Sequence, residues 1–289
     1  MKNFLVILYA TALVGFSVPA FATSITPMDN ADNLAQSLVG SGVAISNVSY
    51  TGADVASGYF AGGTAAGIGI ESGIVLTSGD AMNLNGTTNT SDGITGDNGL
   101  TGTPYLDNLV PGYSTFDATV LEFDFVSDGD AAYFSYVFGS DEYNEWVDSE
   151  FNDVFGFFLD GTAVTDNVAL IPGTTTPVAI NNVNNNSYPV FYNDNDPSDT
   201  GVPFPFEYDG FTDVFAVSIQ GLEPGSTHHI TLAIADAGDH VLDSGVFLEA
   251  GSFSEDPPDP IPEPATMLLL GSGLFGLAGM RRRKLRKNS

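Results

Sequence analysis

The segment from Val120 to Phe138 reads VLEFDFVSDGDAAYFSYVF and is the strongest indicator of fold class in the chain. Apolar and acidic residues alternate from Leu121 to Phe125, which places every second residue, all of them Leu or Phe, on one face of a strand. The turn Asp128-Gly129-Asp130 then leads into the aromatic run from Tyr133 to Phe138. Two such strands joined by a short Gly-containing turn predict a β-hairpin.

Further short strands are predicted through most of the chain. One helix is expected, from Asp29 to Leu38, and residues 83–107 are expected to form a long loop. The other predicted strands are residues 43–50, 67–77, 154–159, 168–171, 214–219, 230–234 and 246–253. Many short strands with Gly- and Asn-rich turns and little helix predict an all-β, jelly-roll-like β-sandwich that forms a single domain over residues 23–254.

The charges divide the chain into an acidic body and basic ends. All 7 Lys and Arg residues are Lys2 or lie within 281–287, whereas all 36 Asp and Glu residues lie between Asp29 and Glu263. Within the body, therefore, only His residues and the new N-terminal amine are available to pair with carboxylates. The strongly negative surface also excludes nucleic acid as a partner. Because the chain has no Cys, the exported protein forms no disulfides.

The N-terminus has the three parts of a secretory signal peptide. Lys2 gives a positive start, residues 4–18 are apolar, and Ala20 and Ala22 form an A-x-A cleavage site. We therefore expect residues 1–22 to be removed by signal peptidase, so that the mature chain begins near Thr23.

The C-terminus carries a second targeting signal. An acidic, Pro-rich linker over residues 255–264 ends in Pro262-Glu263-Pro264, and residues 265–280 are uncharged. At ~1.5 Å per residue, a helix over 265–280 is short but is predicted to span the membrane. The basic tail over 281–289 begins with Arg281-Arg282-Arg283 and should stay in the cytoplasm, which places the acidic body outside.

This order of Pro-Glu-Pro, apolar helix and Arg-rich tail resembles the PEP-CTERM sorting segment of Gram-negative bacteria. The resemblance implies transient anchoring in the inner membrane and cleavage of the tail by exosortase, a membrane protease-transpeptidase. It further implies display at the cell surface or in the extracellular matrix, where such proteins usually accompany exopolysaccharide. A plain C-terminal membrane anchor is the alternative.

Three segments of the body resemble the choice-of-anchor L domain of bacterial surface proteins. They are 138–158, which begins Phe138-Gly139-Ser140-Asp141-Glu142, 167–184 and 235–248. Residues 208–212 also fit, and the resemblance extends over about residues 32–253. It implies export and surface display and brings no established catalytic activity. Members of the family often carry Cys, which this chain lacks.

Several acidic segments are candidates for a calcium site, and the Asp-dense segment with Asp194, Asp196 and Asp199 could contribute if the fold brings it close. Carboxylates repel one another unless a cation compensates them, and Ca²⁺ prefers carboxylate, amide and carbonyl oxygens. None of the acidic segments has EF-hand spacing, and a solvated acidic loop is the alternative for each of them. The predicted structural Ca²⁺ ligands are Asp141, Glu142, Asn144, Glu145, Asn152, Asp153, Asp236, Asp239 and Asp243.

Other side chains suggest different chemistry. Tyr143 and Trp146, within the acidic loop, are candidate carbohydrate contacts, although Trp146 could instead fill the core. His228 and His229 should point to opposite faces of a strand, so they do not favour a zinc site. Glu142 and Glu145 could serve a glycosidase, but acidic pairs are too common here to single one out. The chain also lacks a G-x-S-x-G motif and a phosphate-binding loop, so we expect no enzyme.

The sequence thus predicts an exported surface or matrix protein with a Ca²⁺-stabilised β-sandwich. Its expected role is association with exopolysaccharide, adhesion or aggregation. A carbohydrate-binding module without a matrix role is the first alternative, and a secreted glycosidase is the second.

Overall fold

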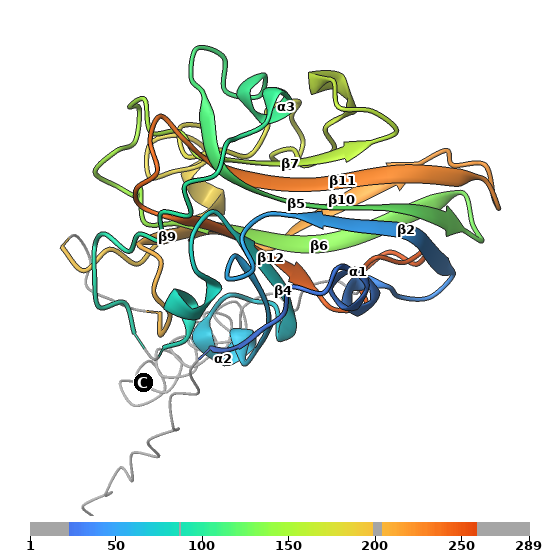
Figure 1. Ribbon diagram of the computed structural model, residues 1–289, viewed down its shortest axis with the longest axis horizontal. Coiled ribbons are helices and arrows are strands. Elements are labelled where there is room, and N and C mark those ends of the chain that lie inside the picture. The colour runs from blue at the N-terminus through green and yellow to red at the C-terminus, as the bar shows by residue number, and fades with distance from the viewer. Residues whose placement is uncertain (1–22, 87, 199–203, 259–289) are drawn as a thin grey trace, which may run out of the picture. The chain divides into compact units, whose positions relative to one another are not determined.

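Two antiparallel β-sheets form the body of the protein (Figure 1). The computed structural model describes residues 23–86, 88–198 and 204–258, and the described residues up to Pro257 form one compact unit. The larger sheet contains β1 (Ser24–Pro27), β3 (Ser57–Ala61), β4 (Ser72–Thr77), β12 (Ser244–Glu249), β6 (Ala131–Ser140), β9 (Gly210–Thr212) and β8 (Tyr192–Asp194) in this order, with β10 (Phe215–Gln220) also paired to β6. The smaller sheet contains β2 (Val43–Thr51), β5 (Thr115–Ser127), β11 (Thr227–Ala237) and β7 (Val154–Leu159). These sheets confirm the predicted all-β sandwich, and the jelly-roll topology stays a prediction.

The helices of the described chain are short. The predicted N-terminal helix is confirmed as α1 (Ala31–Leu38), where the Asn30 side chain accepts a hydrogen bond from the Asn33 N–H at 2.9 Å. Its buried side chains are Leu34, Ala35 and Leu38. The remaining helices are α2 (Gly63–Ala66), α3 (Pro104–Asp107) and the 3₁₀ turns Ala81–Leu84, Val164–Asp166 and Pro189–Phe191.

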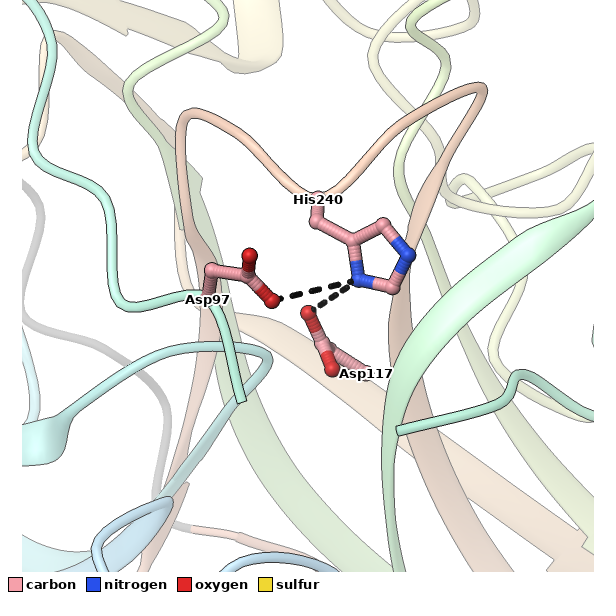
Figure 2. A group of neighbouring side chains, drawn as sticks. All are labelled: Asp97, Asp117 and His240. Atoms are coloured by element: carbon pink, nitrogen blue, oxygen red, sulfur yellow. Dashed lines mark hydrogen bonds and ion pairs between the residues drawn. The ribbon is translucent and has the colours of Figure 1, made fainter. Parts of the chain in front are cut away.

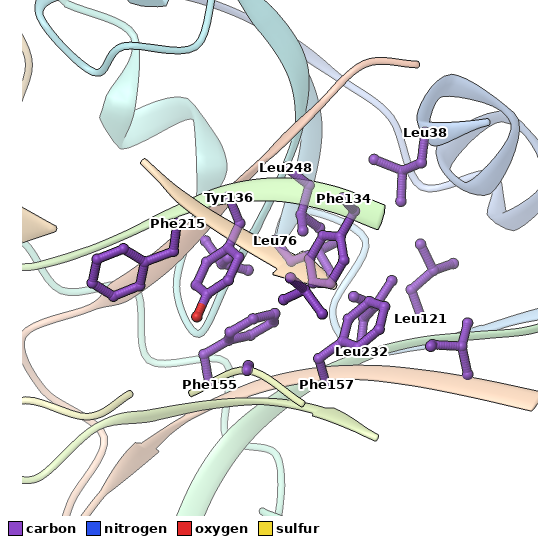
Figure 3. Packing of buried hydrophobic residues seen from close by; sticks show 14 of the residues in the cluster. Leu38, Leu76, Leu121, Phe134, Tyr136, Phe155, Phe157, Phe215, Leu232 and Leu248 are labelled. Carbon is purple, nitrogen blue, oxygen red and sulfur yellow. The ribbon is translucent and has the colours of Figure 1, made fainter. Parts of the chain in front are cut away.

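Aromatic and aliphatic side chains from the facing sheets meet in the core (Figure 3). Phe134 of β6 stacks on Phe157 of β7 with ring centroids 3.9 Å apart, and both are buried. Leu121 of β5 and Leu232 of β11 extend the same cluster. Burial of each such side chain contributes about 1.5–3 kcal/mol, so this inter-sheet cluster is the main source of stability in a chain without disulfides.

The predicted hairpin between the opening strands is wrong. β5 pairs with β2 and β11, whereas β6 pairs with β12, β9 and β10. The turn at residues 128–130 therefore leads from one sheet to the other. The physical reason is that both strands carry an apolar face, and the two faces become buried by packing against each other across the sandwich.

Two other strand predictions need correction. Residues 168–171 form no strand and contribute only an isolated bridge, between Leu170 and Pro177, because the Asn167 side chain accepts the backbone N–H groups of Phe157 and Ala169. Of the predicted segment 67–77, only residues from Ser72 onward form a strand, since Gly67 ends α2 with a positive φ. The described part of residues 83–107 contains no strand, as expected of a loop, although it ends in the short helix α3. The remaining predicted strands overlap β2, β7, β10, β11 and β12, although residues 250–253 of the last prediction lie beyond the end of β12.

The predicted targeting signals lie outside the described residues. These segments are the signal peptide at residues 1–22, the Pro-Glu-Pro motif at residues 262–264, the predicted spanning helix at 265–280 and the basic tail. Within the part of the chain that the structure describes, no helix is long and apolar enough to cross a membrane.

Candidate cation-binding end of the sandwich

Strand register brings acidic residues from distant parts of the chain to one end of the sandwich. In the larger sheet Ser244 is paired with Ser140, so Asp243 and Asp141 are the next residues beyond the ladder. The Asp141 N–H donates to the Asp243 carbonyl at 3.2 Å. In the smaller sheet Ala235 pairs with Val154, which leaves Asp236 and Asp153 next in line. We call Asp141, Glu142, Asp153, Asp236 and Asp243 the carboxylate end.

The Ser244 side chain connects the two sheets at this end. Its hydroxyl donates to Oδ2 of Asp153 at 2.6 Å, although Ser244 lies in β12 and Asp153 precedes β7. The other Asp153 oxygen accepts the Ala237 N–H at 2.8 Å. Despite these bonds, burial raises the pKa of Asp153 to about 8.

Asp236 is the least compensated acid of the carboxylate end. The residue is 1% exposed, and neither of its carboxylate oxygens has a hydrogen-bond partner. Burial, followed by the charges of Asp153 and Asp243, holds its pKa well above the usual range, and the nearby Ser78 hydroxyl opposes this only in part.

Glu142 has a similar environment. It is 1% exposed, and its Oε2 has no hydrogen-bond partner. Burial raises its pKa to about 10, with further contributions from Asp153, Asp239 and Asp141. The half-buried Asp239 therefore lies close enough to affect both Glu142 and Asp153.

Asp141 and Asp243 are held by backbone donors from the long loop after β4. The Ile94 N–H donates to Asp141 at 3.0 Å, and the Gly96 N–H donates to Asp243 at 2.8 Å. Oδ1 of Asp141 and Oδ2 of Asp243 have no partner. Burial is the largest cause of the raised pKa of both groups, which reaches about 6 for Asp243.

Histidines pair with other carboxylates but not with these. Asp117 and Asp97 lie 2.7 Å and 3.6 Å from Nδ1 of His240 (Figure 2). The shorter distance is that of a hydrogen bond, so His240 serves as the partner of the buried Asp117. His228 pairs with Asp160, and His229 with Asp124 and Glu122. Among the residues described, no ion pair reaches the carboxylate end.

The predicted amide ligands have other roles. Oδ1 of Asn152 accepts the Asn181 N–H at 2.8 Å and thereby holds the neighbouring loop. Asn144 accepts the Tyr192 hydroxyl at 2.7 Å and donates to Asp194 at 3.2 Å. Glu145 is exposed and lies beside Asp196 and Ser198. The structure therefore divides the predicted ligand set between the carboxylate end and the segment after β8.

The sequence reasoning missed further buried acids. Asp117, Glu207 and Asp209 are each at most 4% exposed, yet none was among the predicted ligands. Asp196, from the Asp-dense segment that the sequence also offered as a contributor, is 0% exposed. Asp209 could have been found from its position directly before β9. Asp153 and Asp243 lie in the same way directly before β7 and β12.

The predicted carbohydrate contacts differ in exposure. Tyr143 is 0% exposed and donates its hydroxyl to the Val183 carbonyl at 2.7 Å, so the prediction that it contacts carbohydrate is wrong. Trp146 is 42% exposed and packs edge-to-face on Phe151, so it does not fill the core.

The donor set at the carboxylate end consists of oxygen atoms from side chains that have already been removed from water. Hard cations such as Ca²⁺ prefer oxygen ligands of this kind. The unpartnered oxygens of Asp236, Glu142, Asp141 and Asp243 fit such an ion, because each would otherwise be a buried acceptor without a donor.

Comparison with known protein families matches nearly the whole chain. The model of the choice-of-anchor L domain matches residues 23–254, and that of the PEP-CTERM protein-sorting motif matches residues 260–284. No curated protein and no solved structure matches.

Proposed function

Because the chain belongs to the choice-of-anchor L domain family and ends in a PEP-CTERM protein-sorting motif, we propose that it is a structural surface protein completed by Ca²⁺. The sorting motif indicates export, processing by exosortase and a surface or extracellular destination in a Gram-negative bacterium. We further propose that Ca²⁺ binds at the carboxylate end. The protein would associate with exopolysaccharide and act in adhesion or aggregation.

The unpartnered carboxylate of Asp236 carries the calcium proposal. An isolated buried carboxylate is costly by several kcal/mol, so such a group either binds a proton or is paired with a cation. The body contains no Lys or Arg, and the described His residues pair elsewhere. A metal ion is therefore the remaining cation that suits this position.

Calcium fits better than the other common metals. Zn²⁺ favours Cys and His ligands, which the carboxylate end does not contain. Mg²⁺ usually keeps several waters, whereas Ca²⁺ accepts about six to eight oxygens in flexible geometry. Carboxylates brought together from several strands match this flexible coordination.

Thermal denaturation of the purified protein tests the calcium proposal. We expect Ca²⁺ to raise Tm relative to metal-stripped protein, and Mg²⁺ at the same concentration to raise it less. Equal Tm values in Ca²⁺ and in chelator would contradict a structural calcium ion.

The exposed Trp146 supports the proposed contact with polysaccharide. Its ring projects from the acidic loop near Glu145, and aromatic rings stack on the apolar faces of sugars while acids accept hydroxyl hydrogen bonds. Trp146→Ala should weaken retention on the exopolysaccharide of the producing cells, whereas Met82→Ala, which alters another exposed apolar residue, should not. Equal retention of both variants and the wild type would contradict a role for Trp146.

The glycosidase alternative receives no support from the positions of its candidate acids. Glu142 is buried among Asp153, Asp239 and Asp141, whereas Glu145 is exposed beside Asp196. A catalytic pair must flank one scissile bond. We therefore favour the structural role.

Mass spectrometry of the protein isolated from cells tests its processing. We expect a chain that begins near Thr23 and ends near Pro262-Glu263-Pro264. A C-terminus that retains Arg281-Arg282-Arg283 would contradict cleavage by exosortase.

A further inference from the structure

The geometry points to a second divalent-cation site, formed by Asp196, Asp209 and Glu145. It would connect the segment after β8 to the acidic loop after β6, and it shares no residue with the carboxylate end. Its chemical class is a calcium-type site with oxygen ligands only.

Two buried carboxylate oxygens without partners support this site. Asp196 and Asp209 are both 0% exposed. Each uses Oδ1, which accepts the Ser198 N–H in Asp196 and the Asn89 side-chain amide in Asp209. Oδ2 of each residue is buried and has no hydrogen-bond partner. Buried acceptors of this kind need a donor or a cation.

A hydrogen bond and the electrostatic neighbours bring these acids together: the Ser198 hydroxyl, two residues after Asp196, donates to Glu145 at 3.4 Å. After burial, the charges of Asp196, Glu145 and Asp92 raise the pKa of Asp209, which reaches about 8 although Asn89 opposes the shift. Glu145 is exposed, but its pKa is raised too, by partial burial and by Asp196. Like charges are therefore gathered at one point, where a divalent cation would replace repulsion by attraction.

The surrounding backbone fixes the positions of Asp196 and Asp209. The Asn195 N–H donates to the Asp209 carbonyl at 2.7 Å, and the Asn195 side chain donates to the carbonyls of Phe206 and Tyr208 at 3.0 Å each. The Asp196 N–H donates to Asp194 at 3.1 Å. Both carboxylates are thus held in place before any ion binds, which lowers the entropic cost of binding.

Asp141 lies electrostatically between the two groups of acids. After burial, the largest causes of its raised pKa are Asp209 on one side and Asp243 on the other.

Calcium stoichiometry, measured by equilibrium dialysis of the purified metal-stripped protein, tests the second site. We expect about two tightly bound Ca²⁺ per wild-type chain, and about one in Asp209→Asn. Asp213→Asn removes an exposed carboxylate just beyond β9 and should bind as the wild type does. Asp196→Asn provides the same test as Asp209→Asn at a second residue if Asp209→Asn fails to fold.

The outcomes separate this inference from the proposed calcium at the carboxylate end. Loss of about one ion in Asp209→Asn and of a different ion in Asp236→Asn supports both sites. About one ion in the wild type that is unaffected by Asp209→Asn and Asp196→Asn but lost in Asp236→Asn overturns the second site alone. Wild-type stoichiometry in Asp209→Asn or Asp196→Asn also overturns it.

Discussion

Asp236 combines complete burial with a charge that no protein group balances. Both of its oxygens lack partners, and Asp153 and Asp243 add like charges nearby. In the ion-free protein this residue must hold a proton or destabilise the fold, whereas a bound cation removes the conflict.

Asp236→Asn should remove most of the stabilisation by Ca²⁺. A ligand at 100 times its Kd stabilises a fold by about 2.7 kcal/mol, and we expect the variant to lose most of a gain of that size. The measurement is the difference in Tm between Ca²⁺ and chelator. Asp148→Asn, an exposed acid in the loop after β6, is the matched control and should respond as the wild type does. A full Ca²⁺ response in Asp236→Asn would contradict the assignment.

A pair of buried tyrosines gives a second prediction at the scale of single residues. The Tyr143 hydroxyl donates to the Val183 carbonyl, whereas the Tyr136 hydroxyl is buried without a partner. Tyr143→Phe should lower the free energy of unfolding by about 1–3 kcal/mol, because it leaves a buried acceptor unpaired. Tyr136→Phe removes no hydrogen bond and should be neutral or stabilising. Urea denaturation of both variants measures this, and equal losses would contradict the assigned hydrogen bond.

At the scale of elements, the crossing from β5 to β6 organises the sandwich. The two strands contribute facing apolar surfaces rather than a shared ladder, which is why their edges remain free to pair with β2, β11, β12, β9 and β10. The carboxylate end then lies where β6 and β11 end and where β7 and β12 begin.

Substitutions on the two faces of β6 should have unequal effects. Phe134→Ala removes a ring stacked on Phe157 and should destabilise the fold by about 3–5 kcal/mol. Tyr133→Ala alters the neighbouring, half-buried side chain and should cost clearly less. Chemical denaturation compares them, and an equal cost would contradict the face assignment of β6.

Alternation and turn signals predicted most strands, but they did not predict how the strands pair. Leu121, Phe123 and Phe125 were correctly placed on one buried face, because alternation depends only on local sequence. Whether β5 meets β6 edge-to-edge or face-to-face depends on strands far away in the chain, so the hairpin was mispredicted.

The same reasoning explains what was found of the candidate site. Asp141, Glu142, Asp153, Asp236 and Asp243 stood out as acidic positions next to predicted strands, and the structure brings them together. Asp209 was missed because its approach to Asp141 is set by the register of β9 against β6. The burial of Tyr143 was missed because it depends on contacts with the loop around Val183.

At the scale of the whole molecule, the stability of the metal-free protein should depend on pH in an unusual direction. Asp153 and Glu142 have folded-state pKa values of about 8 and about 10, well above the ~4 of an unfolded carboxyl. Between these values the folded state binds more protons, so stability is greatest at low pH and falls as pH rises from about 4 to about 10, the last part of the fall being due to Glu142.

Melting curves of metal-stripped protein between pH 5 and pH 9 measure this dependence. We expect Tm to fall across the range without metal, and the fall to shrink with saturating Ca²⁺, because the ion favours the ionised carboxylates. A metal-free Tm that rises over the same range would contradict the raised pKa values.

Crystallographic location of calcium by its anomalous scattering tests the central claim most directly, because it shows whether an ion replaces the missing partners of the buried acids. In crystals of the mature protein grown with Ca²⁺, we predict an anomalous peak ~2.3–2.6 Å from oxygens of Asp236 and its neighbours at the carboxylate end. The absence of any peak there, with Asp236 hydrogen-bonded only to protein or water, would contradict the account.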